Sequence, residues 1–289
     1  YQTALRSITF NSTSVDPTIT ASNRTLTWEV TDANSESLGA KTSTAVTSTI
    51  NITPINDTPV LTAGGTLSYT ENETAMVIDN TITISDADDT HLASSIVTIN
   101  SGFTTGDTLT LSTQNGISGT FDSSTGVLSI VGTASLSNYQ TSLRSITFNS
   151  TSEDPTITST TRTITWEVTD ANSESLGAKT STAVTSTINI TPINDTPVLT
   201  AGGTLSYTEN ETAMVIDNTI TISDVDDIEL SGGIVTISSG FTTGDVLTLS
   251  TQNGISGSFN SSTRVLTISG TATLSNYQTA LRSITFNST

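Results

Sequence analysis

The chain has 289 residues, of which 64 are Thr and 43 are Ser, and only 12% are charged. Asp and Glu number 27 against 8 Lys and Arg, giving a formal net charge of −19, which argues against a nucleic acid partner because phosphate binding needs clustered basic residues. There is no Cys and His91 is the only His, which excludes disulfides, thiolate metal sites and zinc sites built on several histidines. No apolar run is long enough to span a membrane.

A long internal repeat organises the chain. The segment Y-Q-T-A-L-R-S-I-T-F at residue 1 returns at residue 139 with one substitution and again at residue 277, so the period is 138 residues. Residues 1–138 and 139–276 differ at only 20 positions. A period of this length corresponds to a whole domain rather than one turn of a solenoid. Because the chain lacks an initiator Met and a signal sequence and starts within a structured-looking segment, we expect a piece of a longer array.

The domain boundaries are predicted at two Pro-flanked turns. The segment I-N-I-T-P-I-N-D-T-P-V occurs at 50–60 and again at 188–198, and its prolines interrupt strand pairing on both sides of Asn-Asp. We therefore expect residues 1–57 to be the C-terminal part of one domain and residues 58–195 to be a complete domain. Residues 196–289 would be the N-terminal part of the next domain.

Strands dominate the complete domain. In T-I-T-W-E-V at 163–168, Ile164, Trp166 and Val168 alternate with polar residues, the two-residue period of a half-buried strand. Asn115-Gly116 is a hairpin signal. The other strand candidates are 66–70, 75–84, 95–100, 107–112, 117–121, 125–131, 145–149 and 186–191. This many short strands rich in Thr, Ile and Val predicts an all-β chain of tandem immunoglobulin-like β-sandwich domains.

One segment per repeat breaks the alternation. In L-S-N-Y-Q-T-S-L-R-S-I at 136–146 the apolar residues Leu136, Tyr139 and Leu143 follow helical spacing. Ser137 and Gln140 have the spacing of a capping box. We expect one short helical turn there, packed on the edge of the sandwich.

Carboxylates gather in a few short turns. These turns are 71–73, 86–89, 153–155, 169–172 and 193–195, with later counterparts at Glu209, Glu211, Asp224, Asp226 and Asp227. Alternating carboxylates present several oxygens to one point, as Ca²⁺ requires with its six to eight oxygen ligands. The alternative is that acidic turns only keep a Thr-rich surface soluble.

The order of four motifs resembles a bacterial cadherin-like domain. These motifs are Y-T-E-N at 69–72, S-D-A-D at 85–88, W-E-V-T-D at 166–170 and I-N-I-T-P-I-N-D-T-P at 188–197. The stretch from Gly106 to the second Y-Q-T-S-L-R-S-I-T-F is similar to the tandem repeats of large bacterial surface adhesins of the RTX, type I-secreted kind. It is more loosely similar to chondroitin sulfate proteoglycan-type repeats. The resemblance implies cadherin-like sandwiches with Ca²⁺ at each junction between domains.

The resemblance also implies which residues bind the ions. At the first junction they are Asn56 and Asp57 of the linker with Asp86, Asp88 and Asp170 of the complete domain. At the second junction they are Asn194, Asp195, Asp224 and Asp226, together with Glu71. The D-R-E motif of the family is absent, and Asp16 and Asp154 lie near its expected place as substitutes. The linker is one residue shorter than in the family, with Pro192 in place of its first Asp, so we expect one or two ions per junction.

These features predict an extracellular, calcium-rigidified repeat segment of a cell-surface adhesin or stalk, acting in adhesion, for example in biofilms, or in spacing. Its partners would be neighbouring repeats and a cell-surface or matrix ligand that the sequence does not specify. Catalysis is disfavoured because His91 is replaced by Glu229 in the next copy and aromatic residues are few. A carbohydrate-binding module stays an alternative. So does a self-assembling filament or sheath subunit, because residues 14–57 would supply, head to tail, the last strands that 196–289 lack.

Overall fold

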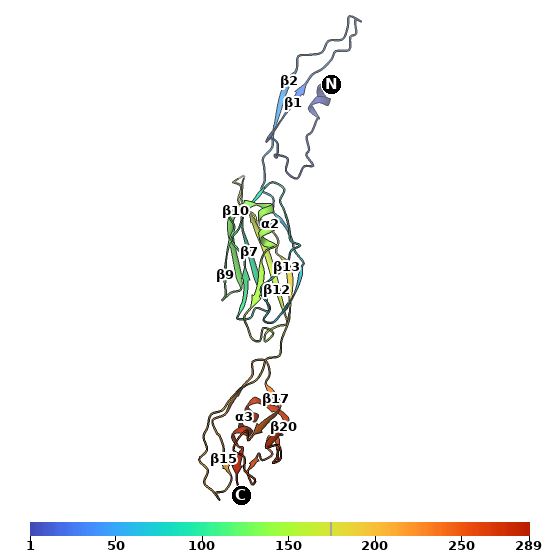
Figure 1. The fold of residues 1–289 in the computed structure, drawn as a ribbon. Helices are drawn as coiled ribbons and strands as arrows, with labels where there is room; N and C mark the ends of the chain where they lie inside the picture. Colours follow the sequence, from blue (N-terminus) through green and yellow to red (C-terminus); the bar gives the residue numbers. More distant parts are fainter. Residues whose placement is uncertain (174) are drawn as a thin grey trace. The chain divides into compact units, whose positions relative to one another are not determined.

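The computed structural model describes residues 1–173 and 175–289, which form two compact units, Tyr1–Thr191 and Pro192–Thr289. Strands are the main regular secondary structure of each unit (Figure 1). None of the helices in the described residues has the length and apolar character needed to cross a membrane.

The first 57 residues hold a short helix and a hairpin. Helix α1 (Gln2–Arg6) is followed by β1 (Asn23–Trp28) and β2 (Val46–Asn51). The two strands pair antiparallel, with Trp28 opposite Val46. Alternate residues of β1 are half-buried and the others are exposed, so the hairpin presents one apolar face.

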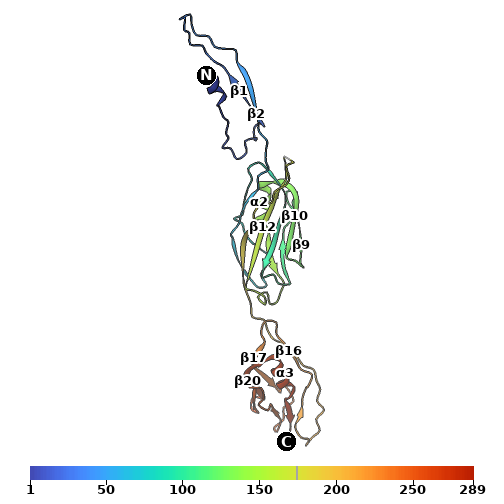
Figure 2. The same ribbon diagram turned by 180° about the vertical axis from the view of Figure 1, so that it is seen from behind.

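Residues 58–191, called the middle domain below, contain one large sheet. Its strands lie in the order β4 (Thr66–Thr70), β13 (Val184–Thr191), β12 (Thr161–Asp170), β7 (His91–Ser101), β10 (Val127–Ser135) and β9 (Ser118–Asp122). Neighbouring strands pair antiparallel, except that β13 and β4 are parallel. Figure 2 shows β10 and β9 side by side at one edge of this sheet.

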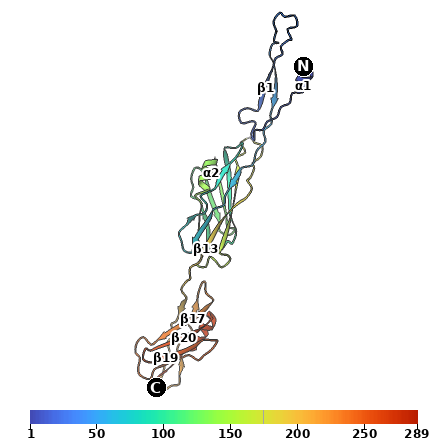
Figure 3. The ribbon, with the colours of Figure 1, turned by 90° about the vertical axis from the view of Figure 1, so that its right-hand side faces the viewer.

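A second, smaller layer faces this sheet. It consists of the sheet β5 (Met76–Val77), β11 (Thr147–Ser150) and β8 (Asp107–Thr110), together with the pair β3 (Val60–Thr62) and β6 (Thr83–Ser85). Helix α2 (Leu136–Leu143) follows β10 directly and lies at the edge of the sandwich (Figure 3). The middle domain is therefore the all-β sandwich with one short helix that the sequence predicts.

The core between the two layers is apolar and fully enclosed. Trp166, Ile164 and Val168 of β12 are each 0% exposed, as their alternation predicts. The rings of Tyr69 and Phe148, which come from opposite layers, meet edge to face with centroids 5.0 Å apart. Burial of aromatic side chains of this size accounts for much of the hydrophobic stabilisation of a domain.

Two local predictions differ from the structure. The N-cap of α2 is Ser135, whose side chain accepts from the N–H of Asn138, whereas Ser137 lies inside the helix; Gln140 accepts from the N–H of Ile84 rather than closing a capping box. The single strand expected over 75–84 is two strands, β5 and β6. They are separated by a turn in which Asp79 accepts from the N–H of Thr81.

A buried ion pair joins the two layers of the middle domain. Arg162 of β12 and Asp107 of β8 are both fully enclosed, with Arg162 Nε 2.6 Å from Asp107 Oδ2. Arg162 also donates to the carbonyls of Pro155 and Ser159, and Asp107 accepts from the N–H of Thr104. Breaking such a pair leaves an uncompensated buried charge, which is strongly destabilising.

Residues 192–289 repeat the order of the elements from β3 to β11 of the middle domain, without a counterpart of β4. The strand pair is β14 (Val198–Thr200) with β16 (Thr221–Ser223), and the small sheet is β15 (Met214–Val215), β21 (Thr285–Asn287) and β18 (Val246–Thr248). Helix α3 (Leu274–Arg282) is capped by Thr273. The larger sheet holds β17 (Glu229–Thr236), β20 (Val265–Thr273) and β19 (Ser256–Asn260).

Candidate metal centre

Acidic and amide side chains from three separate segments meet at one end of the middle domain. The linker contributes Asn56 and Asp57, the turn after β6 contributes Asp86, Asp88 and Asp89, and the end of β12 contributes Asp170. The linker enters the middle domain at the same end of the sheet at which β12 ends. Asn56 and Asp170, which are 114 residues apart in sequence, therefore lie together.

The linker is hydrogen-bonded to this end of the domain. The Asn56 side-chain amide donates to Asp170 Oδ2 at 2.9 Å and to the carbonyl of Gly177 at 2.7 Å. The N–H of Asp57 donates to Asp88 Oδ2 at 2.9 Å. The family resemblance implies one ligand set that includes Asn56, Asp57, Asp88 and Asp170, and the structure brings these four residues into contact in two pairs.

The D-A-D-D turn holds its own carboxylates in place. Asp86 Oδ1 accepts from the N–H groups of both Asp88 and Asp89, each at 3.2 Å. Asp89 is 3% exposed and accepts from the N–H and hydroxyl of Ser173. Asp89 was not in the predicted ligand set, and the only sequence signal for it was the doubled Asp at 88–89.

Three carboxylate oxygens of this turn are buried without a hydrogen-bond partner among the described residues. They are Asp86 Oδ2, Asp88 Oδ1 and Asp89 Oδ2. Buried polar atoms in folded proteins are nearly always paired, because an unsatisfied one costs about 1–3 kcal/mol or more for a charged group. A bound cation would satisfy all three oxygens, since carboxylate oxygens are the preferred ligands of Ca²⁺.

The surroundings of Asp86 disfavour its charged form. Burial and, as the second cause, the neighbouring carboxylate of Asp88 raise the pKa of Asp86 to about 6. Asp170, which is 0% exposed, accepts from the N–H groups of Lys179 at 2.8 Å and Asn172 at 2.9 Å. The site thus holds more carboxylate oxygens than the N–H and hydroxyl donors of the described residues pair with.

Two predicted residues serve turns of their own. Asp16 accepts from the N–H and hydroxyl of Thr18, both at 2.8 Å. Asp154 accepts in the same way from Thr156, both at 3.1 Å. Each carboxylate thus closes a local turn before the following strand, and its part in metal binding stays a prediction.

A second pair of carboxylates lies at the other end of the middle domain. Glu71 follows β4, and its N–H donates to the carbonyl of Thr191 at the end of β13. A carboxylate oxygen of Glu71 lies within 4.8 Å of one from Glu153. Glu71 belongs to the predicted set, whereas Glu153 was noticed only as part of an acidic turn.

Residues 192–289 carry a carboxylate cluster of their own. Ligand atoms of Asp224, Asp226 and Asp227 lie within 4.8 Å of one another, and the N–H of Asp195 donates to Asp226 Oδ2 at 3.2 Å. The hydrogen bond with Asp224 raises the pKa of Asp226, while the N–H of Asp227 lowers the pKa of Asp224. The linker residue Asn194 donates to the carbonyl of Asp195 at 3.0 Å.

Comparison with known proteins finds a distant relative in sequence. No family model matches the chain. Over 108 residues, or 35% of its length, the chain is 35% identical to Halomucin from Haloquadratum walsbyi. The matched region is 1% of Halomucin, so the chain spans a very small part of that protein.

Solved structures that the chain matches include extracellular cadherin domains. Protocadherin Gamma B2 domains 1–5 align over 88% of this chain and 39% of theirs, with 14% identity and a TM-score of 0.31. Domains EC21–23 of human CDH23 align over 71% and 59%, with 15% identity and a TM-score of 0.32. Mouse Protocadherin-24 EC1–3 aligns over 87% and 67%, with 13% identity and a TM-score of 0.32. These values describe a distant likeness.

Proposed function

We propose that this chain is a segment of an extracellular repeat array in which Ca²⁺ binds where each linker meets the following domain. The observation that carries this proposal is the set of three buried carboxylate oxygens of Asp86, Asp88 and Asp89 without hydrogen-bond partners among the described residues. A turn that only kept the surface soluble would expose its carboxylates to water, whereas here one oxygen of each is enclosed. The bound ion would offset the negative charge of these carboxylates.

The available oxygens suit Ca²⁺ better than a transition metal. All the candidate ligands are carboxylate or amide groups, namely those of Asn56, Asp57, Asp86, Asp88, Asp89 and Asp170. Hard oxygen donors without His or Cys favour Ca²⁺ or Mg²⁺ over Zn²⁺ or Cu²⁺. Ca²⁺ also accepts the irregular arrangement that a linker and a turn can offer, while Mg²⁺ demands a near-ideal octahedron.

The mechanical consequence follows from where these ligands come from. Asn56 and Asp57 belong to the linker, and Asp86, Asp88 and Asp170 belong to the domain that follows it. An ion shared between the two groups would tie the linker to the domain and cancel repulsion among the carboxylates. Removal of the ion would leave each sandwich with its own apolar core, so we expect the linker to loosen before any domain unfolds.

The proposed role in adhesion or spacing at the cell surface is argued from the repetition of near-identical domains along the chain. Near-identical domains in series extend a chain by a fixed length per repeat, and the excess of acidic over basic residues suits a hydrated exterior. The similarity to a small part of Halomucin does not indicate a particular ligand. No catalytic step is part of the proposal.

The sequence leaves two alternatives to this proposal, a carbohydrate-binding module and head-to-tail self-assembly. A carbohydrate-binding module would need an exposed aromatic platform, but Trp166 is fully enclosed and Trp28 is half-buried with its indole N–H on Ser48. Head-to-tail self-assembly stays an alternative that no contact within the described residues tests.

Small-angle X-ray scattering of the 289-residue chain tests the calcium-dependent stiffness. We expect a longer maximum dimension and a narrower distance distribution in millimolar Ca²⁺ than in chelator. The variant Asp88→Asn should reduce this difference, while Asp122→Asn should not, because Asp122 is exposed on β9 and the repeat carries Asn260 in its place. Identical scattering with Ca²⁺ and with chelator would refute the stiffening.

A further inference from the structure

A strand near the start of the middle domain pairs with the last strand of the domain, and the two are parallel. β4 and β13, called the terminal-strand pair below, pair over five residues each, ending with Thr70 opposite Thr191. The other strand pairs of the described residues are antiparallel. The N–H of Thr187 donates to the carbonyl of Gly65 at 3.0 Å, and the N–H of Glu71 donates to the carbonyl of Thr191 at 2.9 Å. The pair is therefore hydrogen-bonded at both of its ends.

The two strands of this pair lead to opposite ends of the middle domain (Figure 1). The first linker leads into β3, and β4 follows after residues 63–65, while β13 ends at Thr191 and leads into the next linker. A pull on both linkers therefore draws β4 and β13 past each other. Because the strands are parallel, this pull loads all the hydrogen bonds between them at once. Strands that are pulled apart from one end lose their hydrogen bonds one after another, which needs less force.

A buried carboxylate fastens both strands at the start of the pair. Asp79 is 2% exposed and lies in the turn between β5 and β6. It accepts from the N–H groups of Gly64 and Gly65, just before β4, at 3.0 and 2.7 Å. It also accepts from the hydroxyl of Ser186 on β13 at 2.7 Å. Hydrogen bonds to an ionised acceptor are roughly twice as strong as neutral ones, so one side chain ties β4 and β13 to the smaller layer.

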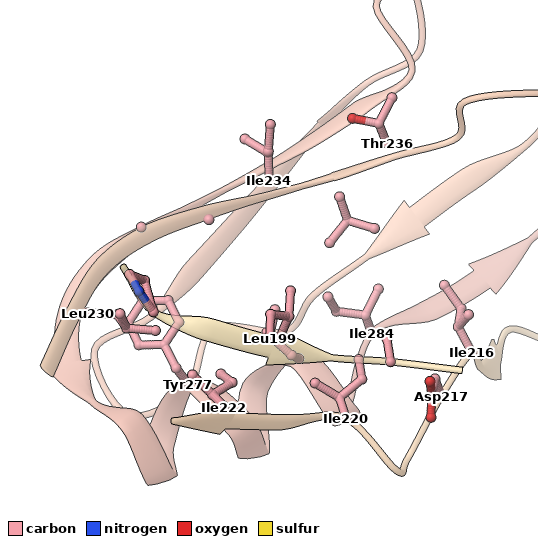
Figure 4. Close-up of a pocket in the computed structure, with 16 residues that line it drawn as sticks. Leu199, Ile216, Asp217, Ile220, Ile222, Leu230, Ile234, Thr236, Tyr277 and Ile284 are labelled. Atoms are coloured by element: carbon pink, nitrogen blue, oxygen red, sulfur yellow. The ribbon is translucent and has the colours of Figure 1, made fainter. Parts of the chain in front are cut away.

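The fastening by a carboxylate recurs along the chain. A Cβ at Gly65 would lie 2.5 Å from Asp79 Cγ, so only glycine lets the backbone come this close to the carboxylate. In residues 192–289 the counterpart of Asp79 is Asp217 (Figure 4), which accepts from the N–H groups of Gly202 and Gly203 at 3.0 and 2.7 Å. The contact of this carboxylate with two glycine N–H groups is therefore a property of the repeat.

Side chains of the terminal-strand pair also anchor it in the core. Leu67 and Tyr69 of β4 belong to the same buried cluster as Ile188 and Ile190 of β13. A slip of one strand by one residue would turn its apolar side chains away from the core. Packing as well as hydrogen bonding therefore opposes the sliding of β4 along β13.

We propose that the terminal-strand pair, fastened by Asp79, is a mechanical clamp that makes each domain resist unfolding when the array is stretched. This adds load bearing to spacing, and it rests on the proposed function in that a pulling force must pass along the array. Asp79 is not one of the proposed Ca²⁺ ligands, and the clamp lies within one domain. The clamp should therefore hold in chelator.

Single-molecule force spectroscopy of the 289-residue chain in chelator tests the clamp by changing only the direction of pull. The chain has no Cys, so handles can be attached at introduced cysteines in exposed positions. Thr58→Cys with Thr196→Cys pulls β4 and β13 past each other, whereas Thr74→Cys with Thr196→Cys peels them apart from the end at Thr70. At the same loading rate, the middle domain should unfold at a several-fold higher force in the first geometry, because forced unfolding is governed by the unfolding barrier.

Similar unfolding forces in the two geometries would overturn the inference. Both forces are measured on domains that differ only in the handles, so a difference in overall stability does not account for a difference in force. Because the measurement is made in chelator, its outcome is also independent of whether Ca²⁺ binds. Failure of the clamp and failure of the calcium proposal are thus distinguishable.

A substitution at Asp79 tests the fastening itself. Asp79→Ala should lower the force in the first geometry and leave the peeling force nearly unchanged, because peeling starts at the end of the pair that lies away from Asp79. An equal fall of both forces would instead indicate a general loss of stability and would overturn the role of Asp79 in the clamp. The exposed control Asp122→Asn should change neither force. If Asp79→Ala does not fold, the comparison of the two geometries still decides the inference.

Discussion

Replacing Asp86 by Asn separates the metal site from a purely structural turn, because the substitution should have opposite effects on stability without and with calcium. In the calcium-free protein, the amide side chain introduced by Asp86→Asn can still accept from the N–H groups of Asp88 and Asp89. It can also donate to the buried oxygen of Asp88 that has no partner among the described residues. The substitution removes one of several neighbouring negative charges and adds a hydrogen-bond donor beside an oxygen that has none. The variant should therefore be more stable than the unsubstituted protein in chelator.

The expected gain in stability of Asp86→Asn in chelator follows from the pKa of Asp86. The rise of this pKa from 3.8 to about 6 means that the charged Asp86 destabilises the folded state by at most about 3 kcal/mol at neutral pH. We take about 1 kcal/mol, because the carboxyl group keeps some contact with solvent that screens it. In a domain of this size that is a rise in Tm of about 3 °C in chelator.

With calcium the expected effect is reversed. Loss of one anionic ligand should weaken Ca²⁺ binding at least tenfold, which removes about 1.4 kcal/mol of the stabilisation by bound ion. The assay is thermal unfolding followed by Trp166 emission in a Trp28→Phe background, with Asp122→Asn as control. An Asp86→Asn variant that gains as much Tm from Ca²⁺ as the unsubstituted protein would refute the reasoning.

Three further predictions concern the middle domain. Between pH 4 and 7 in chelator, the stability of the domain should fall as pH rises, because Asp86 with its raised pKa favours the folded state only while it is protonated. In millimolar Ca²⁺ the trend should reverse. Measurements of Tm across this pH range check both expectations. Arg162→Met should cost about 3–5 kcal/mol by urea unfolding, because it leaves the charge of Asp107 buried and unpaired, and a cost below about 1 kcal/mol would contradict that. Gly102→Ala should lower Tm, because Gly102 has φ +75° and a Cβ there would collide with the Thr161 carbonyl oxygen; an unchanged Tm would contradict this placement.

Much of the sandwich can be predicted from the sequence because one face of most strands is buried. The alternation of Ile164, Trp166 and Val168 with Thr and Glu fixes which side of β12 faces the core. The departure at 136–146 marks the segment of the repeat whose apolar spacing fits a helix. The spacing of Ser137 and Gln140 predicts the N-cap at Ser137, whereas the structure has it at Ser135. The position of the cap depends on where β10 ends, which is at Ser135.

Features that depend on distant pairs could not be predicted in this way. Asp79 breaks the strand expected over 75–84, since its carboxylate accepts from the N–H groups of Gly64 and Gly65 and from the hydroxyl of Ser186. The ion pair of Arg162 with Asp107 joins residues 55 positions apart. No local pattern indicates either contact.

The candidate metal site shows the same division. The family resemblance named Asn56, Asp57, Asp88 and Asp170 within one ligand set, and in the structure Asn56 is hydrogen-bonded to Asp170 and Asp57 to Asp88. It did not name Asp89, whose burial depends on Ser173 from the turn after β12. Whether these groups bind an ion stays a prediction, because ligand geometry is a tertiary property.

Isothermal titration calorimetry of the 289-residue chain with Ca²⁺ at neutral pH tests the central claim most directly. The account predicts saturable binding that is weakened by Asp88→Asn and unchanged by Asp122→Asn, together with a higher Tm of the middle domain in Ca²⁺ than in chelator. No binding heat up to millimolar Ca²⁺, with the same Tm in both conditions, would contradict it.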